Sequence, residues 1–331
     1  MRKKKVTMLD IATAVGVSQP TVSVILNGSD SIKVSQETRD KVLAKADELG
    51  YQRKANVRHA SHHRRIALLV NSINMHDPFI NAITAAKVRA WELDILLVVY
   101  DYEDDELLKQ AMLKEIQEGQ YSALIYAANT PKQIDDEPKL GIPLLYLNCN
   151  NPESSVQSPA ILTSDFIGGY RATEHLLQRG YKRIAMIGGE RWSDSSIQRI
   201  SGYRQALLNT DTPINDDWIV EGNWSVKQSF LETKKLLSQS PCPNAIFCAS
   251  DLMALGVYQA VAEMGLRIPH DVAVMGYDNQ LLASELTPSL SSIDLPYDEM
   301  GRMAVELAVG DHQTELQLIK VEGDLYPRES T

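Results

Sequence analysis

The sequence predicts an N-terminal all-α helix-turn-helix domain joined to a larger α/β body, which consists of two lobes with parallel sheets. Three short helical patterns separated by turn residues occupy residues 1–50. From residue 66 onward, short apolar runs alternate with helical periodicity, as in β-α-β units. Residues 1–65 carry 13 Lys and Arg against 6 Asp and Glu, whereas the rest carries 20 against 37. This basic head on an acidic body indicates a polyanion-binding domain attached to one that avoids DNA.

Composition excludes several classes of protein. The chain has 331 residues, of which 44% are hydrophobic and 23% charged, as in ordinary globular proteins. No apolar run approaches the ~18–20 residues that a membrane helix requires, and no apolar signal core follows the basic N-terminus. The three cysteines, Cys149, Cys242 and Cys248, are too widely spaced for a metal site or a disulfide framework. We therefore expect a cytoplasmic protein with no membrane segment, no metal and no cofactor.

Three helices are expected in the head. Thr7 to Asp10 resembles a capping box that begins the first helix, and Gly16 ends it with a tight turn. Ser18 is a good N-cap for the second helix, and Ser35 begins the third. The side chains expected to face inward are Leu9, Ile11, Ala12, Val15, Val22, Ile25, Leu26, Val42, Ala46 and Leu49. Two short helices joined through a glycine turn, with a third packed across them, form the helix-turn-helix arrangement.

The outer face of the second helix is polar. Short side chains there can approach phosphates and base edges closely. They are Gln19, Thr21, Ser23 and Asn27. A three-helix bundle without a ligand fits the spacing equally well, and the positive charge of the head decides in favour of DNA.

In the body, the β-α-β rhythm occurs twice. The predicted strands are 66–70, 95–100, 123–126, 144–147, 182–187, 245–248 and 272–275, with helices near 79–90, 104–117, 197–208 and 253–264. The segment that starts at Lys182 echoes the one that starts at Arg64, with an offset of 118 residues. We expect a first lobe of about 66–163 and 296–320, a second of about 164–293 and 321–331, and a cleft between them.

Ligands bind in such clefts at the carboxyl ends of the strands. The segments just after predicted strands are therefore candidates: Asn71, the loop 75–79, Asn148, the loop 188–196, Ser250-Asp251 and Tyr277-Asp278. Their side chains are mainly polar or aromatic, as a cleft for a hydroxylated molecule requires. For any one Asp in this position, the competing interpretation is a helix cap.

The head also resembles a known family. The segments 6–12, 16–23, 34–39 and 49–51, together with Asn27, are similar to the head of the lactose/galactose repressor (LacI/GalR) family, and a looser likeness covers nearly the whole chain. The resemblance implies that Gln19, Pro20 and Val24 read bases and that the neighbouring polar side chains hold phosphates. Val24 stands where many relatives carry a longer residue, so the operator half-site is expected to differ. The residues expected to contact DNA in the head are Thr7, Ser18, Gln19, Pro20, Thr21, Ser23, Val24 and Asn27.

Residues 52–65 are a basic linker without an apolar face, which we expect to gain order on DNA. In the family, this stretch forms a hinge helix in the minor groove, where a leucine wedges a base step. Arg58 is predicted to enter the minor groove. Ala60 occupies the leucine position and is too small to unstack bases well, which puts kinking of the duplex in question. His59, His62 and His63 are interpreted as part of a solvated linker rather than a metal site.

For the body, the resemblance implies a periplasmic-binding-protein-like fold with an effector between its lobes. Arg199 matches an arginine that bonds ligand hydroxyls or a carboxylate. Trp224 matches an aromatic platform, with interface packing as the alternative, and Asp278 matches an acceptor. Ser250 is expected to face the cleft, and Asp251 to be structural. The effector-binding residues are thus expected to be Asn71, Met75, Asp77, Phe79, Asn148, Arg199, Trp224, Ser250 and Asp278.

The leading hypothesis is a homodimeric transcription regulator, a repressor on a pseudo-palindromic DNA operator, controlled by a small-molecule effector that is a sugar or sugar derivative. A sugar-binding protein of the transport type is an alternative, which the basic head and the missing signal peptide oppose. An enzyme of sugar or nucleotide metabolism is another. No phosphate-binding Gly-Lys-Ser/Thr loop, Gly-x-Ser-x-Gly elbow or His-Glu-x-x-His motif occurs, so no catalytic residue is expected.

Overall fold

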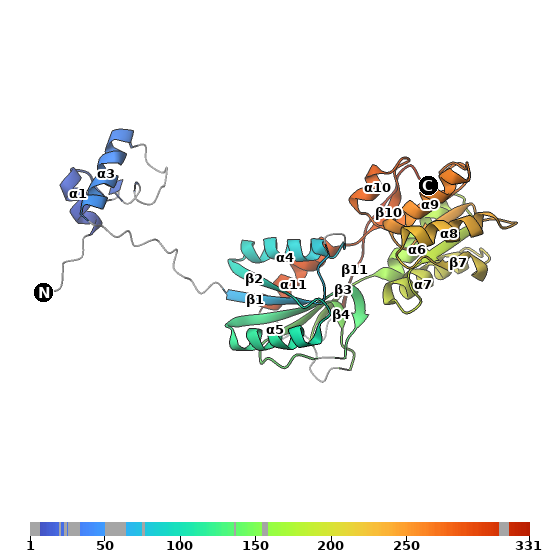
Figure 1. Ribbon diagram of the computed structural model, residues 1–331, viewed down its shortest axis with the longest axis horizontal. Coiled ribbons are helices and arrows are strands. Elements are labelled where there is room, and N and C mark those ends of the chain that lie inside the picture. The colour runs from blue at the N-terminus through green and yellow to red at the C-terminus, as the bar shows by residue number, and fades with distance from the viewer. Residues whose placement is uncertain are drawn as a thin grey trace. The chain divides into compact units, whose positions relative to one another are not determined.

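The computed structural model describes residues 7–19, 21–22, 25, 34–49, 64–74, 77–135, 137–153, 158–310 and 318–331. Contacts within the chain divide it into two compact units, Met1–His63 and Arg64–Thr331 (Figure 1). Among the described residues, no helix is long and apolar enough to cross a membrane.

The head contains helices α1 (Met8–Val15) and α3 (Gln36–Glu48). The predicted capping box is confirmed, because Thr7 and Asp10 bond each other's backbone N–H groups, and Gly16 ends α1 in the left-handed region at φ 74°. Ser18 Oγ accepts from the N–H of Thr21 at 3.2 Å, as expected of an N-cap. Among the described residues of this unit, the buried hydrophobic side chains are Ile11, Ala12, Val22, Ile25, Val42 and Ala46. Leu26, Gly28 and Gly50 lie outside the described residues.

The first lobe of the body is built on a six-stranded sheet with the order β11-β5-β4-β3-β1-β2. All of its strand pairs are parallel. The strands are β1 (Arg64–Val70), β2 (Ile95–Asp101), β3 (Tyr121–Gln133), β4 (Leu144–Asn150), β5 (Ala160–Thr163) and β11 (Leu318–Val321). Side chains of β1 alternate between two cores: Ile66 and Leu68 pack with α4 (Ile80–Glu92) and α11 (Tyr297–Val309), whereas Ala67 and Leu69 pack with α5 (Glu106–Glu118).

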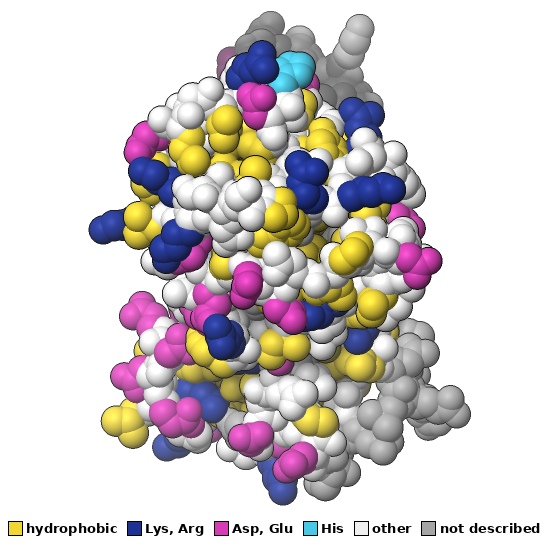
Figure 2. Space-filling view, turned by 90° about the vertical axis from the view of Figure 1, so that its right-hand side faces the viewer, with side chains coloured by type: hydrophobic (Ala, Val, Ile, Leu, Met, Phe, Trp, Pro, Cys, Tyr) yellow, Lys and Arg dark blue, Asp and Glu magenta, His cyan; other side chains and the backbone are white. Residues whose placement is uncertain are grey.

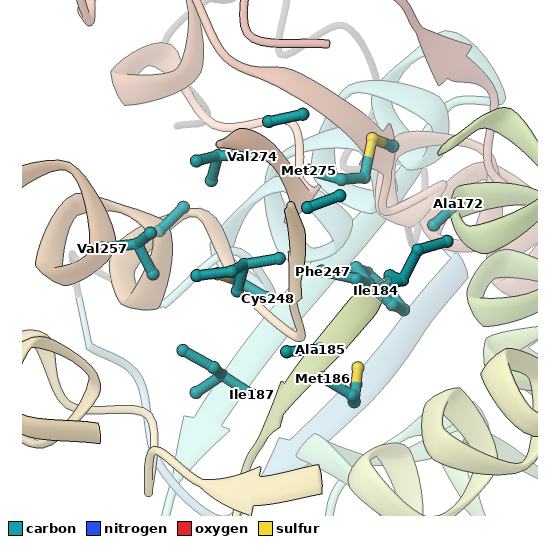
Figure 3. Close-up of a cluster of buried hydrophobic side chains, with 14 of the residues drawn as sticks. Ala172, Ile184, Ala185, Met186, Ile187, Phe247, Cys248, Val257, Val274 and Met275 are labelled. Atoms are coloured by element: carbon teal, nitrogen blue, oxygen red, sulfur yellow. The ribbon is translucent and has the colours of Figure 1, made fainter. Parts of the chain in front are cut away.

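The second lobe has a similar six-stranded sheet with the order β12-β10-β9-β8-β6-β7, in which the pair β10-β12 is antiparallel and the other pairs are parallel. Its strands are β6 (Ile184–Gly188), β7 (Ile219–Glu221), β8 (Ala245–Cys248), β9 (Ala273–Asp278), β10 (Ser291–Asp294) and β12 (Leu325–Tyr326). Its helices are α6 (Asp165–Gln178), α7 (Asp194–Asn209), the short 3-10 helix η1 (Asp216–Trp218), α8 (Val226–Leu237), α9 (Asp251–Glu263) and α10 (Leu281–Glu285). Figure 3 shows the core, with Ala172 of α6 on one side of β6 and β8 and Val257 of α9 on the other.

The duplicated β-α-β pattern predicted from the sequence is confirmed. The strand at Arg64 begins two residues earlier than predicted, because Arg64 and Arg65 pair with Ile95 and Leu96 of β2. Several elements were not predicted, among them β5, α6, α8, β10 and α11. The strands β5 and β10 have only four residues each, and α6 contains two adjacent glycines, which weakens its helical signal. Figure 2 shows Asp and Glu side chains gathered in the lower half of the side formed by the second lobe.

The chain passes between the lobes three times, from β5 to α6, from β10 to α11 and from β11 to β12. These crossovers are bonded to one another through their backbones. The N–H of Ser164 donates to the carbonyl of Val321 at 2.8 Å, and the N–H of Asp294 donates to that of Asp324 at 2.8 Å. Gly323 packs so closely on Asp294 that a Cβ there would collide with its carbonyl oxygen. The three crossovers therefore form one continuous backbone layer.

Helices α6 and α7 approach each other at the distance that two glycines permit. A Cβ at Gly169 would lie 2.7 Å from Cα of Arg199, and a Cβ at Gly202 would lie 2.6 Å from the backbone nitrogen of Tyr170. Both distances are below ordinary van der Waals contact, so no other residue fits without a shift. This close packing brings the start of α6, Asp165, next to Arg199.

Replacing Gly202 by alanine is expected to lower the free energy of unfolding by about 1–3 kcal/mol, because the new methyl group meets the backbone of α6. Urea unfolding of the purified chain measures this change. Ser201→Ala is the matched control, since the hydroxyl of Ser201 donates to the carbonyl of Ile197 within its own helix. Its effect should stay within about 0.5 kcal/mol, and equal losses in the two variants would contradict the close-packing argument.

Candidate functional site

A pocket of about 310 Å³ lies between the two lobes, at the carboxyl ends of their strands. This is the place that the parallel topology predicts for a ligand. The first lobe and the crossover contribute Asn74, Asp77, Pro78, Asn129, Thr130, Pro131, Leu295 and Tyr297. The second lobe contributes Ser193, Ser195, Arg199, Trp224, Ser250, Leu252, Asp278 and Gln280. A ligand here would touch both lobes at once.

A second hollow, of about 470 Å³, lies in the first lobe beside the start of β4 and the end of α11. Its described walls come mainly from Pro138–Leu145 and from Leu307, Ala308 and Gly310. They carry two ionisable side chains, Glu137 and Lys139, and no convergent set of polar groups. The pocket between the lobes is the better candidate because buried charged groups converge there.

Arg199 is the central group of the pocket and is only 4% exposed. Its Nε donates to Asp165 Oδ1 at 2.8 Å, its Nη1 donates to the carbonyl of Ala249, and Asp278 Oδ1 lies 3.6 Å from Nη1. The guanidinium also lies over the ring of Tyr277, with 3.6 Å between the guanidinium carbon and the ring centroid. A buried cation requires such compensation, and here two carboxylates and an aromatic face supply it.

The charges of the pocket shift one another's pKa values. Burial acts to lower the pKa of Arg199, but Asp165, Tyr277 and Asp278 together raise it, so the guanidinium stays charged. Burial raises the pKa of Asp278 well above its ordinary value, against the lowering effect of Arg199. Burial also raises the pKa of Asp77, although bonds from the N–H of Phe79 and from Asn129 lower it. An ionised carboxylate in this pocket is therefore costly unless a hydrogen-bond donor reaches it.

Trp224 is held at the pocket by unusual backbone. Asn223 and Trp224 both lie in the left-handed region, at φ 51° and 54°, which a bulky residue rarely adopts without a constraint. The ring packs against Gly189, where a Cβ would lie 2.7 Å from Trp224 Nε1. The Arg199 guanidinium lies 5.8 Å from the Trp224 ring centroid. Both interpretations of Trp224 hold, because the residue lines the pocket and also packs against the hydrophobic core of the second lobe.

On the first lobe, side chains behind the pocket hold those that line it. Asn71 Oδ1 accepts from the N–H of Asn129 at 2.9 Å, and Asn71 Nδ2 donates to Asn129 Oδ1 at 2.9 Å. Asn129 Nδ2 in turn donates to Asp77 Oδ2 at 3.1 Å. Phe79 packs edge-on against Tyr297, with ring centroids 5.3 Å apart. The wall on this side is therefore fixed from behind.

Ser250 caps α9 and Asp251 is its first residue, and the two side chains have different roles. Ser250 Oγ accepts from the N–H of Met253 at 3.1 Å, so this serine caps the helix while it lines the pocket. Asp251 is fully buried, and its carboxylate accepts from the hydroxyl of Ser292 at 2.7 Å and from the N–H of Gln280 at 2.8 Å. Among the residues that the structure describes, no group of His, Cys, Asp and Glu is arranged to hold a metal.

The structure brings five of the nine predicted effector-binding residues to the pocket wall: Asp77, Arg199, Trp224, Ser250 and Asp278. Three others are buried and do not line it: Asn71, Phe79 and Asn148. Met75 lies outside the described residues. Sequence reasoning missed Asn129, which directly follows the buried run of β3, a position that should have singled it out. It also missed Tyr297, which lines the pocket three residues after β10, because β10 itself was not predicted.

In the head, the structure describes four of the predicted DNA-contacting residues. Ser18 and Gln19 are exposed at the start of the second helix, and Thr21 is half-buried. Thr7 is exposed, but its side chain is engaged in the capping box of α1. The predicted residues outside the described part of the chain are Pro20, Ser23, Val24, Asn27, Arg58 and Ala60.

Comparison with known proteins accounts for both units. Residues 7–54 match the model of bacterial regulatory proteins of the lacI family, and residues 173–331 match that of the periplasmic binding protein-like domain. The ribose operon repressor of Haemophilus influenzae is 34% identical over 324 residues, which are 97% of this chain and 94% of that protein. The chain belongs to the lacI family of bacterial regulatory proteins. The HTH-type transcriptional repressor PurR of Salmonella paratyphi B is 29% identical over 98% of this chain and 96% of its own length.

Solved structures of lacI-family regulators agree with this assignment. The Lac repressor dimer bound to operator and the anti-inducer ONPF has a TM-score of 0.67 and 29% identity, and the match covers 99% of each chain. The complex of the transcriptional regulator CelR with cellobiose has a TM-score of 0.69 and 27% identity, over 98% of this chain and 100% of that one. The expected fold, a helix-turn-helix head on a two-lobed body with parallel sheets, is confirmed. This chain is thus a DNA-binding transcription regulator controlled by an effector.

The buried carboxylate behind the pocket predicts a pH effect on stability. Burial raises the pKa of Asp251 from 3.8 to about 7, although the hydroxyl of Ser292 and the N–H of Gln280 lower it. Its contribution to stability is therefore fully present below about pH 4 and is lost as the pH rises through about 7. From about pH 5 to about pH 8, the free energy of unfolding of the wild type should fall relative to that of Asp251→Asn, by on the order of 2 kcal/mol. Urea unfolding across this range measures the difference, and parallel curves would refute it.

Proposed function

We propose that this chain is a homodimeric repressor that binds a pseudo-palindromic operator. Its affinity for the operator is controlled by an uncharged sugar, of the size of a pentose, that binds between the lobes. The observation that carries the proposal is the buried guanidinium of Arg199 at the centre of a polar pocket between two lobes. The head of residues 1–51 would bind DNA, residues 52–65 would join it to the body, and residues 66–331 would bind the effector and dimerise.

The charge of the pocket favours an uncharged ligand. Among the described residues that line it, Arg199 is the one with a positive charge, whereas Asp77 and Asp278 are acidic. Arg199 already pairs with Asp165 at 2.8 Å, so little positive charge remains for a phosphate. Hydroxyl groups suit this pocket because each can donate to a carboxylate and accept from the guanidinium. The ribose operon repressor among the relatives supports a pentose, and CelR binds cellobiose.

In this proposal, each pocket residue has its own role in binding the sugar. Arg199 and Asp278 bond ligand hydroxyls, Trp224 offers its ring face to the apolar side of the sugar, and Asp77 and Ser250 complete the polar wall. Three buried residues hold the lining residues in position without lining the pocket themselves. They are Asn71, which bonds Asn129, and Phe79 and Asn148, which contact Tyr297. Met75 lies outside the described residues, and its role as an effector-binding residue stays a prediction.

On DNA, we propose that Gln19, Pro20 and Val24 read bases, whereas Thr7, Ser18, Thr21, Ser23 and Asn27 contact phosphates, with Arg58 and Ala60 at the minor groove. The exposure of Ser18 and Gln19 supports this role. Because the mechanism is binding, we propose that the ligand is released unchanged, without catalysis, and that the protein acts in the cytoplasm on chromosomal DNA.

Exposed apolar side chains on the body support a homodimer. Val88 and Trp91 on α4 are 46% and 68% exposed, and Leu96 on the edge strand β2 is 45% exposed. On the second lobe, Leu252 and Leu281 are 45% and 77% exposed. Such residues suit a surface that a second copy covers, and the Lac repressor structure is that of a dimer on its operator. Two heads would then meet the two half-sites of a pseudo-palindrome.

The function can be tested with duplexes that the purified full-length chain selects from genomic DNA. We expect salt-dependent, sequence-selective retention that a neutral sugar such as D-ribose modulates. Arg199→Ala should keep the DNA binding and lose the response, with ligand affinity falling by about 100-fold.

Arg191→Ala is the matched control, because Arg191 pairs with Glu221 and its side chain is 88% exposed. It should respond as the wild type does. Failure to select any duplex would contradict the proposed function, and equal loss of DNA and ligand binding in Arg199→Ala would contradict the role of Arg199.

The dimer is tested by placing a charge in the proposed interface. Trp91→Glu should shift the chain from dimer to monomer at micromolar concentration, since a carboxylate would be buried against the second copy without a partner. Multi-angle light scattering measures the mass. Leu107→Glu on α5 is the control, because Leu107 is 83% exposed outside the proposed interface. A wild-type chain that is monomeric, or a dimer that persists in Trp91→Glu, would refute this surface.

A further inference from the structure

Tyr297 stands where the second crossover enters the first lobe. It is the first residue of α11, its side chain lines the pocket, and it is only 4% exposed. Its backbone N–H donates to the carbonyl of Leu295 at 2.7 Å, and its ring meets Phe79 at an interplanar angle of 85°. Both contacts fix the direction in which the phenol points.

Asn148 determines how the hydroxyl of Tyr297 can bond. Asn148 Nδ2 donates to the carbonyl of Ala128 at 2.9 Å and to Tyr297 Oη at 3.3 Å. The Ala128 carbonyl accepts only, so it fixes the amide with its nitrogen on this side. Tyr297 Oη therefore accepts from Asn148, and its single hydrogen must be donated elsewhere. Among the residues that the structure describes, no protein acceptor takes this hydrogen.

The surrounding charges keep that hydrogen in place. Burial raises the pKa of Tyr297, and Asp165 and Asp77 raise it further, against the lowering effect of Arg199. The phenol is therefore protonated at neutral pH and acts as a donor. Tyr297 lines the pocket together with Asp77, Arg199 and Asp278.

We propose that Tyr297 is a specificity-determining residue, whose hydroxyl donates to one oxygen of the sugar, with Asn148 as the residue that positions it. The inference rests on the proposed function and deepens it. Arg199 and Asp278 bind from the second lobe, whereas Tyr297 binds from the first, so a ligand that lacks this oxygen loses one of its hydrogen bonds to the first lobe. A site built for a hydroxyl discriminates against the analogue without it, because a buried donor is then left unpaired.

Calorimetry on the full-length chain tests the proposal, with D-ribose and its monodeoxy analogues as probes. Tyr297→Phe keeps the ring and removes the hydroxyl. D-ribose should bind this variant roughly 3- to 10-fold more weakly than it binds the wild type. Against one monodeoxy analogue, the wild type and the variant should bind equally, because the bond is already missing. Equal affinity for D-ribose, or an equal loss toward every analogue, would overturn the proposal.

Tyr170→Phe is the matched control. Tyr170 Oη also accepts from an asparagine amide, that of Asn209, at 3.2 Å, but Tyr170 does not line the pocket. Its removal should leave binding of every probe unchanged.

If the wild type does not bind D-ribose, the proposed ligand is refuted but the role of Tyr297 is not. A second measurement then decides whether the hydroxyl of Tyr297 is free to donate to a ligand. A crystal structure of the sugar-free full-length chain should then show an ordered water at hydrogen-bond distance from Tyr297 Oη, on the side opposite Asn148. A phenol that instead donates to the carboxylate of Asp77 or Asp278 would overturn the inference, because its hydrogen would not be free for a ligand.

Discussion

The burial of one guanidinium is the constraint on which the body of this protein depends. Arg199 is nearly inaccessible to water, and an unpaired charge in that position would cost several kcal/mol. Asp165 at the start of α6 and two neighbouring residues at the end of β9, Tyr277 through its ring face and Asp278 through its carboxylate, offset this cost. The close approach of α6 and α7 at their glycines serves the same end, because it sets Asp165 beside the guanidinium. In this lobe, the contacts that pack the helices together are therefore also the contacts that position the charged groups of the site.

The same arrangement connects the pocket to the crossovers. Thr163 is the last residue of β5, and its hydroxyl donates to Asp165 Oδ2 at 2.6 Å, while Asp165 Oδ1 accepts from Arg199. One carboxylate thus touches the strand that leaves the first lobe and the cation that lines the pocket. A ligand that hydrogen-bonds Arg199 therefore acts, through Asp165, on a crossover. This contact is a physical route from occupancy of the pocket to the relative position of the lobes.

The sequence predicts the fold well where a local pattern carries the information. The caps at Thr7 and Ser18 and the buried strand at Ile66 follow from spacing and residue type alone, and the structure confirms them. Polar residues at the carboxyl ends of strands also point to the pocket, as for Asp278. The pattern cannot separate a side chain on the wall from one behind it. Asn148 follows the same rule as Asp278 but is fully buried, because its amide is used by Ala128 and Tyr297.

Tyr297 lay beyond sequence reasoning for a related reason, since a crossover between lobes brings it to the pocket and leaves no periodic signal. The three crossovers between the lobes are also joined to one another. Since Gly323 rests on the backbone of Asp294, and hydrogen bonds join the three passages, they cannot bend independently. The lobes should then move as rigid bodies that rotate about a single hinge axis, with little freedom to slide or twist against each other. Binding of a ligand in the pocket would therefore change one angle, the angle between the two lobes. That angle can change in only two directions, so the regulator can respond by opening or by closing the lobes.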